Sequence, residues 1–267
     1  MTRITDFMRQ AKLLGCESVT ITGGGEPLMY KQWQLLLDLL YAFGIEVGLV
    51  TNGVLLDHLH SPMSWCRISC SDNLPDQLNR IGKDESSWFQ TIKEAVNRNG
   101  QTDWAFSYVS TENTQLNLIC DIISFAKSHN FTHVRLVSDI LNADSLASKM
   151  LDIQKHFILT DSVDCSKVIF QPRSEWVSGQ NPCFISLLKP VIGADGYVYP
   201  CCGAQYSLPN SSFDYEKELR MGVVEDLHEL VKEQRFFDGS VCSKCYYSGY
   251  NYALGVLLSD LKHEKFV

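Results

Sequence analysis

Between residues 19 and 137, short runs of β-branched and aromatic residues alternate with longer segments whose apolar residues recur at helical spacing. The expected strands cover residues 19–22, 45–50, 65–70, 104–109 and 133–137, and the expected helices cover 2–15, 33–43, 88–99 and 116–129. Strands separated by helices are joined by right-handed crossovers and form a parallel sheet. The pattern therefore predicts an α/β fold whose sheet is covered by helices.

Composition narrows the class of partner. The 267 residues are 45% hydrophobic and 20% charged, which is typical of a globular protein with a sizeable core. A net charge of -8 argues against broad binding to nucleic acids or anionic membranes. No stretch reaches the ~18 apolar residues of a membrane span, and the first residues lack the apolar core of a signal peptide. We expect a cytoplasmic protein with a small-molecule or peptide partner.

The composition changes near residue 175. The later part is rich in Cys, Gly, Pro and Tyr, with strand-like pieces at 187–192 and 196–199 and a turn at 194–196. We therefore expect two domains, a larger one at 1–175 and a small cysteine-rich module at 176–267. A last helix is expected at 252–261.

Four cysteines of the module have spacings that predict a metal site. They are Cys183, Cys201 and the Cys-x-x-Cys pair formed by Cys242 and Cys245. Such a pair places two thiolates on one side of a metal, and the other two cysteines complete a four-sulfur shell. Zinc and an iron–sulfur cluster both fit, unlinked buried thiols are the plain alternative, and the neighbouring Cys202 either packs nearby or replaces a ligand.

The remaining cysteines are expected to be structural. Cys66 and Cys70 share one face of the expected strand 65–70, but four strand residues separate them by roughly 13 Å, too far for one cluster. Cys16, Cys120 and Cys165 are isolated in sequence and are interpreted as core or surface thiols.

The first expected strand ends in the turn Gly-Gly-Gly-Glu-Pro at residues 23–27. Glycines allow a ligand to approach the backbone closely, and Glu26 can accept hydrogen bonds from a cationic group. A purely structural strand-to-helix turn would also explain a glycine run on its own.

With these motifs together, the chain resembles radical S-adenosylmethionine enzymes that carry a C-terminal twitch or SPASM-type auxiliary-cluster module. Residues 24–27 match the GGEP motif of that family, the stretch Val-Thr-Asn-Gly at 50–53 matches the end of the next strand, and 67–69 resemble the strand after it. In the module, Cys183, Gly196 and Cys201 fit the pattern C-x9-15-G-x4-C.

The resemblance implies a partial (β/α)6 TIM-like barrel and a radical chemistry. In the family a four-iron four-sulfur cluster cleaves S-adenosylmethionine to a 5′-deoxyadenosyl radical that abstracts hydrogen from the substrate, here expected to be a peptide or a small polar metabolite. An auxiliary 4Fe-4S cluster relays an electron, and flavodoxin or ferredoxin is the kind of electron donor expected. No catalytic base is assigned. The residues that the resemblance assigns to S-adenosylmethionine are Gly24, Gly25, Glu26, Pro27, Thr51, Asn52 and Ser69, and those assigned to the auxiliary cluster are Cys183, Cys201, Cys242 and Cys245.

The sequence also departs from the family. The C-x3-C-x2-C loop that holds the cleaving cluster is absent, since only Cys16 precedes Gly24, and the first βα unit is absent with it. The first interpretation is a misplaced start or a split gene, with a second chain covering the exposed barrel edge. The alternative is a catalytically inactive, zinc- or iron–sulfur-binding protein that binds a partner and keeps a relic of the fold. Ser71 also stands where an aspartate often follows the ribose-side serine, and Asp72 comes one residue later.

Overall fold

The computed structural model describes residues 2–114, 116–139, 143–160, 166–171, 177–203 and 219–258. The chain divides into two compact units. The sheet unit is Cys16–Ser174, and the module is Glu175–Val267 together with Met1–Gly15. The division after residue 174 lies where the composition changes, whereas the N-terminal helix α1 (Thr2–Leu13), which the sequence places in the larger domain, groups with the module.

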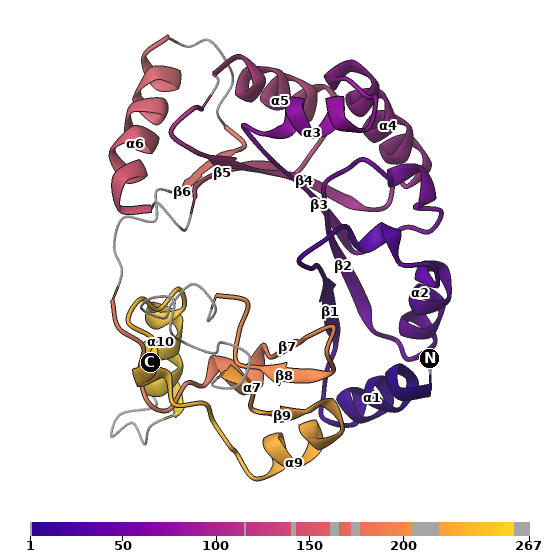
Figure 1. Cartoon of the computed structure of the whole chain (residues 1–267), viewed down its shortest axis with the longest axis vertical. Coiled ribbons are helices and arrows are strands. Elements are labelled where there is room, and N and C mark those ends of the chain that lie inside the picture. Colours follow the sequence, from indigo (N-terminus) through magenta and orange to yellow (C-terminus); the bar gives the residue numbers. More distant parts are fainter. Residues whose placement is uncertain are drawn as a thin grey trace, which may run out of the picture. The chain divides into compact units, whose positions relative to one another are not determined.

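The sheet unit contains a six-stranded parallel sheet with the strand order β1-β2-β3-β4-β5-β6. The strands are β1 (Ser18–Ile21), β2 (Glu46–Thr51), β3 (Trp65–Ser71), β4 (Asp103–Ser110), β5 (His133–Ser138) and β6 (Val168–Gln171). The five expected strands are thus confirmed to within a residue or two at their ends, and β6 is an additional strand. In the described sheet β1 and β6 are the edges, and Figure 1 shows the strands following an arc.

The helices of the sheet unit lie on the outer side of this arc (Figure 1). They are α2 (Trp33–Ala42), α3 (Leu74–Arg80), α4 (Glu85–Arg98), α5 (Leu116–Ser128) and α6 (Ala143–Thr160), with short 3-10 turns η1 (Pro27–Met29) and η2 (Leu56–His58). An aromatic core anchors them, since Trp88, Phe106 and Phe131 are completely buried and the last two rings stack at 4.7 Å between centroids. None of the described helices is both long and apolar enough to cross a bilayer.

Alternation along the strands gives the sheet two chemically different faces. On β3, Cys66, Ile68 and Cys70 are buried on the side of the helices, while Arg67 and Ser69 on the opposite side are only half-buried. We call this second face, which is the concave side of the arc in Figure 1, the inner face.

The module is built on a small antiparallel sheet of β7 (Val191–Ile192), β8 (Tyr197–Tyr199) and β9 (Gly222–Val223). The expected turn at 194–196 is confirmed, with Gly196 at φ +84°. The expected strand at 187–192 is wrong in its first half, because residues 187 and 188 belong to helix α7 (Ile185–Leu188). The remaining elements are η5 (Val224–Asp226), α9 (Leu227–Lys232), η6 (Gly239–Val241) and α10 (Ser248–Leu258).

The core of the module explains the grouping of α1. Val198, Leu227 and Leu230 are buried together, and Phe7 and Leu14 pack against them. The helical periodicity of residues 2–15 is therefore confirmed, and part of its apolar stripe belongs to the module.

Candidate functional site

The Glu26 carboxylate joins the turn after β1 to the end of β2. Its Oε1 accepts hydrogen bonds from the hydroxyl of Thr51 at 2.7 Å and from the backbone N–H of Leu28 at 3.1 Å. Its Oε2 accepts a bond of 2.8 Å from the backbone N–H of Asn52. A carboxylate offers about four lone-pair sites, so three are occupied by the protein itself. Glu26 therefore fixes the shape of the turn, and within the described residues three of its acceptor sites are used.

The glycines of this turn are exposed, and neither packing nor backbone conformation within the chain requires glycine at Gly24 or Gly25. Gly24 and Gly25 have no positive φ, and a Cβ built on either would meet no atom within 4 Å. Glycine at such a position costs backbone entropy without a steric gain within the chain. The structure of the chain itself therefore gives no steric reason for glycine at these two positions.

The other residues expected to bind the cofactor are divided between the two faces of the sheet. Thr51 is only 2% exposed, and its hydroxyl also accepts a hydrogen bond from the backbone N–H of Gly53 at 3.1 Å. Its side chain thus supports Glu26 from the helix side. Asn52 forms a local turn through its side-chain oxygen, which accepts from the N–H of Val54 at 2.9 Å. Ser69 lies on the inner face, one residue beyond the β3 partner of Thr51.

Asp72 has a structural role that its sequence position does not reveal. Its Oδ2 accepts hydrogen bonds from the backbone N–H and the hydroxyl of Thr111, at 2.9 Å and 2.5 Å, and from the hydroxyl of Thr114 at 3.2 Å. The phenol of Tyr108 donates to its Oδ1. The carboxylate therefore ties the end of β3 to the loop after β4. Only the density of Thr residues after β4 in the sequence hints at this network.

The four cysteines of the predicted metal site line one pocket of the module. Cys183, Cys201, Cys242 and Cys245 come from three separate segments of the chain, and all four border the same cavity. Three backbone hydrogen bonds bring the first and last segments together: Gly179 N–H to Cys242 O at 2.8 Å, Cys245 N–H to Val177 O at 2.7 Å, and Cys183 N–H to Phe237 O at 3.0 Å.

Two glycines allow this close approach of the cysteine-bearing segments. A Cβ at Gly179 would lie 2.1 Å from the carbonyl oxygen of Gly239, and a Cβ at Gly239 would lie 2.3 Å from that of Gln180. Both contacts are with backbone atoms that cannot move aside cheaply. Here, unlike in the turn at Gly24, packing within the chain requires glycine.

Asn251 of α10 fastens the Cys183 segment. It is 3% exposed, and its Oδ1 accepts hydrogen bonds from the N–H of Phe184 at 2.7 Å and of Ile185 at 3.4 Å. Its Nδ2 donates to the Pro182 carbonyl at 3.0 Å and to Gln180 Oε1 at 3.1 Å. A buried amide satisfied by four partners holds the residues on both sides of Cys183 in place.

The pKa values of the cysteine thiols in the pocket are raised because the thiols are partly buried and lie near one another. The pKa of Cys242 is raised to about 11, first by burial and then by the nearby thiols of Cys245 and Cys183 and the carboxylate of Asp238. Burial likewise raises the pKa of Cys183 and of Cys245. Without a positive ion, the thiols of Cys183, Cys242 and Cys245 are therefore protonated at neutral pH, and a bound metal would have to displace these protons.

The residue types around the pocket fit both kinds of metal site that the sequence predicts. In the described part of the chain, no three His, Cys, Asp or Glu side chains converge closely enough to bind a single ion. Tetrahedral zinc, with Zn–S near 2.3 Å, needs sulfurs only about 3.8 Å apart. Four cysteine thiols are also the ligand set of an iron–sulfur cluster.

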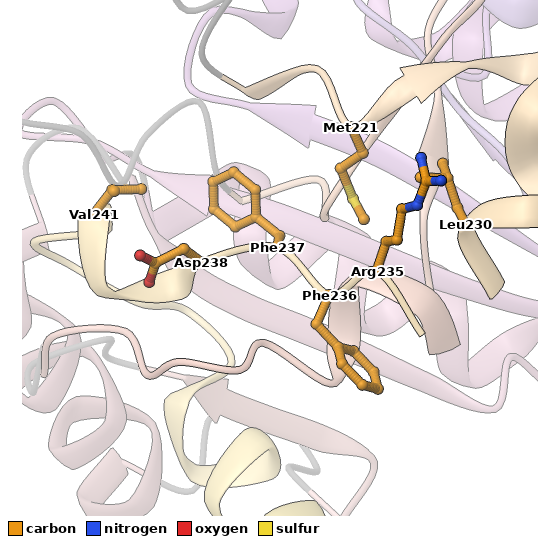
Figure 2. Close-up of a pocket in the computed structure, with 7 residues that line it drawn as sticks. All are labelled: Met221, Leu230, Arg235, Phe236, Phe237, Asp238 and Val241. Carbon is orange, nitrogen blue, oxygen red and sulfur yellow. The ribbon is translucent and has the colours of Figure 1, made fainter. Parts of the chain in front are cut away.

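A second pocket of the module shares a wall with the first. It measures about 340 Å³ and is lined by Met221, Leu230, Arg235, Phe236, Phe237, Asp238 and Val241 (Figure 2). Phe237 borders both cavities. The segment that carries Phe237 therefore lies between the cysteine pocket and this more open cavity.

The cysteines of the sheet unit are placed as expected where the structure describes them. Cys66 and Cys70 are buried in the core, and burial raises the pKa of both thiols far above the neutral range. Cys16 and Cys120 are half-buried. Cys165 lies outside the described residues.

No family model matches the sequence, and no curated protein matches it. Among solved structures, TYW1 with a lysine-pyruvate adduct bound is 16% identical, with a TM-score of 0.40, and covers 57% of this chain and 57% of its own. The crystal structure of archaeal TYW1 is 14% identical, with a TM-score of 0.39 and the same coverage of both chains. This chain thus spans a little over half the length of those chains. A similarity with this TM-score and identity does not show that the chain has the activity of TYW1.

Proposed function

We propose that this chain belongs to a radical S-adenosylmethionine enzyme that abstracts hydrogen from a peptide or a small polar metabolite and uses an auxiliary 4Fe-4S cluster. The observation that carries the proposal is the cysteine pocket, where four thiols from three segments surround one cavity. The sequence motifs at 24–27 and 50–53 support the same conclusion from the other unit.

The auxiliary cluster would be held by Cys183, Cys201, Cys242 and Cys245. When bound, such a cluster supplies a site that accepts or donates one electron. The chain's own contribution is to fix the ligands through the glycine contacts and Asn251, and to keep the pocket half-buried. Because all four ligands come from protein, we propose electron relay as its role.

S-adenosylmethionine would lie on the turn at Gly24 and Gly25. There Glu26 and Thr51 hold the backbone in a fixed shape, and the missing side chains leave room for the methionine end of the cofactor. Ser69, on the inner face beyond β2, would contact the ribose. When the cofactor is bound and reduced by one electron, it supplies the radical that abstracts hydrogen from the substrate.

Three further thiolates are needed for the cleaving cluster, and the 267 residues hold Cys16 as the only cysteine before the turn. We propose that a second chain or segment supplies them and covers the edge strand β1, and that flavodoxin or ferredoxin delivers the electron.

A second candidate function rests on the same missing cysteines. Without that cluster, the chain would be a metal-binding protein that binds a partner and has lost its catalysis.

Substitution of single cysteines tests the proposed ligands. The chain is reconstituted with iron and sulfide without oxygen, and the reduced cluster is followed by electron paramagnetic resonance. Cys183→Ala, Cys201→Ala and Cys245→Ala are each expected to lose most of the bound iron and the signal, because each removes one of four ligands.

Cys202→Ala is the matched control. Cys202 neighbours Cys201 in sequence but lies exposed, with its sulfur 3.4 Å from the hydroxyl of Tyr247. Full iron content and an unchanged spectrum are expected for this variant. Equal losses from Cys202→Ala and Cys201→Ala, or an iron content that none of the three ligand substitutions changes, would contradict the proposed site.

A further inference from the structure

The cavity of about 340 Å³ in the module is not used by the proposed radical chemistry. Most of its lining is apolar, and Figure 2 shows the side chains concerned: Met221, Leu230, Phe236, Phe237 and Val241. A cavity of this volume lies at the small end of the range for ligand sites in proteins. It therefore suits a compact ligand with an apolar body.

The aromatic walls are held in place by contacts outside the cavity. The backbone N–H of Phe237 donates to the hydroxyl of Ser186 at 3.1 Å, and its carbonyl accepts from the N–H of Cys183 at 3.0 Å. The ring of Phe236 meets the ring of Phe184 edge to face, with 5.2 Å between the centroids. These contacts fix both residues before a ligand arrives, which lowers the cost of binding.

The charge of Arg235, one of the two charged residues of the lining, is balanced by a neighbour. Its Nε donates to Oε2 of Glu233 at 2.6 Å, and a terminal nitrogen of the guanidinium forms an ion pair with the same oxygen. Arg235 therefore adds no net charge to the cavity.

The other charged residue, Asp238, is bound only by polar groups. Its Oδ1 accepts hydrogen bonds from the hydroxyl of Ser240 at 2.6 Å and from the backbone N–H of Ser240 at 3.0 Å. These two bonds lower the pKa of the Asp238 carboxyl, so it is ionised at neutral pH. In the described part of the chain, no cation pairs with this carboxylate and its Oδ2 accepts no hydrogen bond. The net charge at the cavity is therefore negative.

We propose that this cavity binds a small molecule that has an aromatic body and an ammonium group. Phe236, Phe237 and Met221 would contact the aromatic body, because aromatic rings and a thioether sulfur both form favourable contacts with a ring. Asp238 would accept the hydrogen bonds of the ammonium group, whose charge complements the carboxylate. The site does not depend on the proposed function, because it needs neither S-adenosylmethionine nor a cluster.

The test is a calorimetric titration of the unmodified chain, purified without oxygen, with three molecules of similar size and shape. They are phenethylamine, which is positive, phenethyl alcohol, which is neutral, and hydrocinnamate, which is negative. Phenethylamine is expected to bind about fivefold more tightly than the alcohol, the upper range for an ion pair in contact with solvent. Hydrocinnamate is expected to bind least tightly.

Substitutions separate the contribution of the charge from that of the apolar walls. Asp238→Asn keeps an acceptor for Ser240 and removes the charge, so it should weaken the binding of phenethylamine about fivefold and leave that of phenethyl alcohol unchanged. Asp226→Asn is the matched control, since it removes an exposed carboxylate that does not line the cavity. Val241→Trp places a larger side chain in the cavity and should weaken the binding of both molecules. Circular dichroism confirms folding.

Three results would overturn the proposal. They are the absence of phenethylamine binding at millimolar concentration, equal affinities for phenethylamine and hydrocinnamate, and equal losses in Asp226→Asn and Asp238→Asn. Phenylalanine amide is titrated in parallel, and its tighter binding would replace the free amine by the end of a peptide as the occupant.

The iron and sulfide contents of the same samples keep this proposal separate from the proposed function. A chain that holds the cluster and binds no amine would contradict this site alone. A chain that binds the amine and holds no iron or sulfide after reconstitution would contradict the proposed function alone.

Discussion

The hydroxyl of Thr51 donates a hydrogen bond of 2.7 Å to Oε1 of Glu26, across 25 residues of sequence. This contact joins the glycine turn after β1 to the end of the neighbouring strand. It gives the exposed turn a fixed shape before any ligand arrives, which lowers the cost of ordering the turn on binding.

The first prediction concerns this contact. Glu26→Gln and Thr51→Val are each expected to lower the free energy of unfolding by about 1–2 kcal/mol, because each leaves a donor or acceptor of the turn without its partner. The double variant should lose less than the sum, since both substitutions remove the same bond. Urea unfolding measures all three. Strict additivity would show that the two side chains do not act through each other.

The glycine turn allows a test that separates binding from stability. Gly25→Ala introduces no clash and no strained φ, so the free energy of unfolding should stay level or rise by about 0.4–1 kcal/mol. Binding of S-adenosylmethionine, measured by equilibrium dialysis, should weaken because the new methyl group occupies the ligand's place. Gly100→Ala is the matched control, as it too has an open surrounding and an ordinary φ. Equal affinities of Gly25→Ala and Gly100→Ala for S-adenosylmethionine would contradict the proposal that the turn binds the cofactor.

Asn251 provides a prediction for the module. Asn251→Asp keeps the acceptor for Phe184 N–H but replaces two donors by an oxygen that faces the Pro182 carbonyl and Gln180 Oε1. Loss of these buried bonds should destabilise the module by about 2–4 kcal/mol. It should also lower the yield of reconstituted cluster, measured as iron per chain. An iron content and a melting temperature equal to those of the unmodified chain would contradict the role of Asn251 in holding the Cys183 segment.

His133 predicts a pH dependence. Its pKa in the folded chain lies below the ordinary value of about 6.5, first because of burial and then because of Arg135 and Arg67. The unfolded chain therefore takes up the proton first as pH falls. Its contribution to stability is complete above pH ~6.5 and is lost as the pH falls towards the folded pKa.

The measurement is the urea midpoint of the chain between pH 7.5 and pH 5. His133→Gln should show a smaller fall of the midpoint than the unmodified chain. The control is His60→Gln, which changes an exposed histidine of the sheet unit. A slope in His133→Gln as steep as that of the control would contradict this assignment.

The regular part of the fold was predictable because its signals are local. β1 to β5 are runs of β-branched or aromatic residues between amphipathic helices. Each can be recognised from a sequence window of about ten residues. β6 has only four residues, Val168–Gln171, and it becomes recognisable through its pairing with β5. Residues 187 and 188 are apolar and fit a strand equally well, so local composition could not reveal the turn of helix α7.

The site was predictable in its residue types but less so in its contacts. The four cysteines singled out by their spacing border one pocket, and their role as metal ligands stays a prediction. Sequence could not show that Glu26 would have most of its acceptor sites occupied by Thr51, Leu28 and Asn52, because these partners depend on the pairing of β1 with β2. Gly48 is a similar case. A Cβ at this position would lie 2.1 Å from the indole of Trp65, which belongs to the neighbouring strand β3.

The most direct test of the account is the iron, acid-labile sulfide and zinc content of the 267-residue chain purified without oxygen. A 4Fe-4S cluster at Cys183, Cys201, Cys242 and Cys245 predicts about four irons and four sulfides per chain, a broad visible absorption band, and the loss of all three in Cys242→Ala. About one zinc per chain with no sulfide would contradict it. The pocket would then be a structural zinc site, and the function of the chain would be binding rather than radical chemistry.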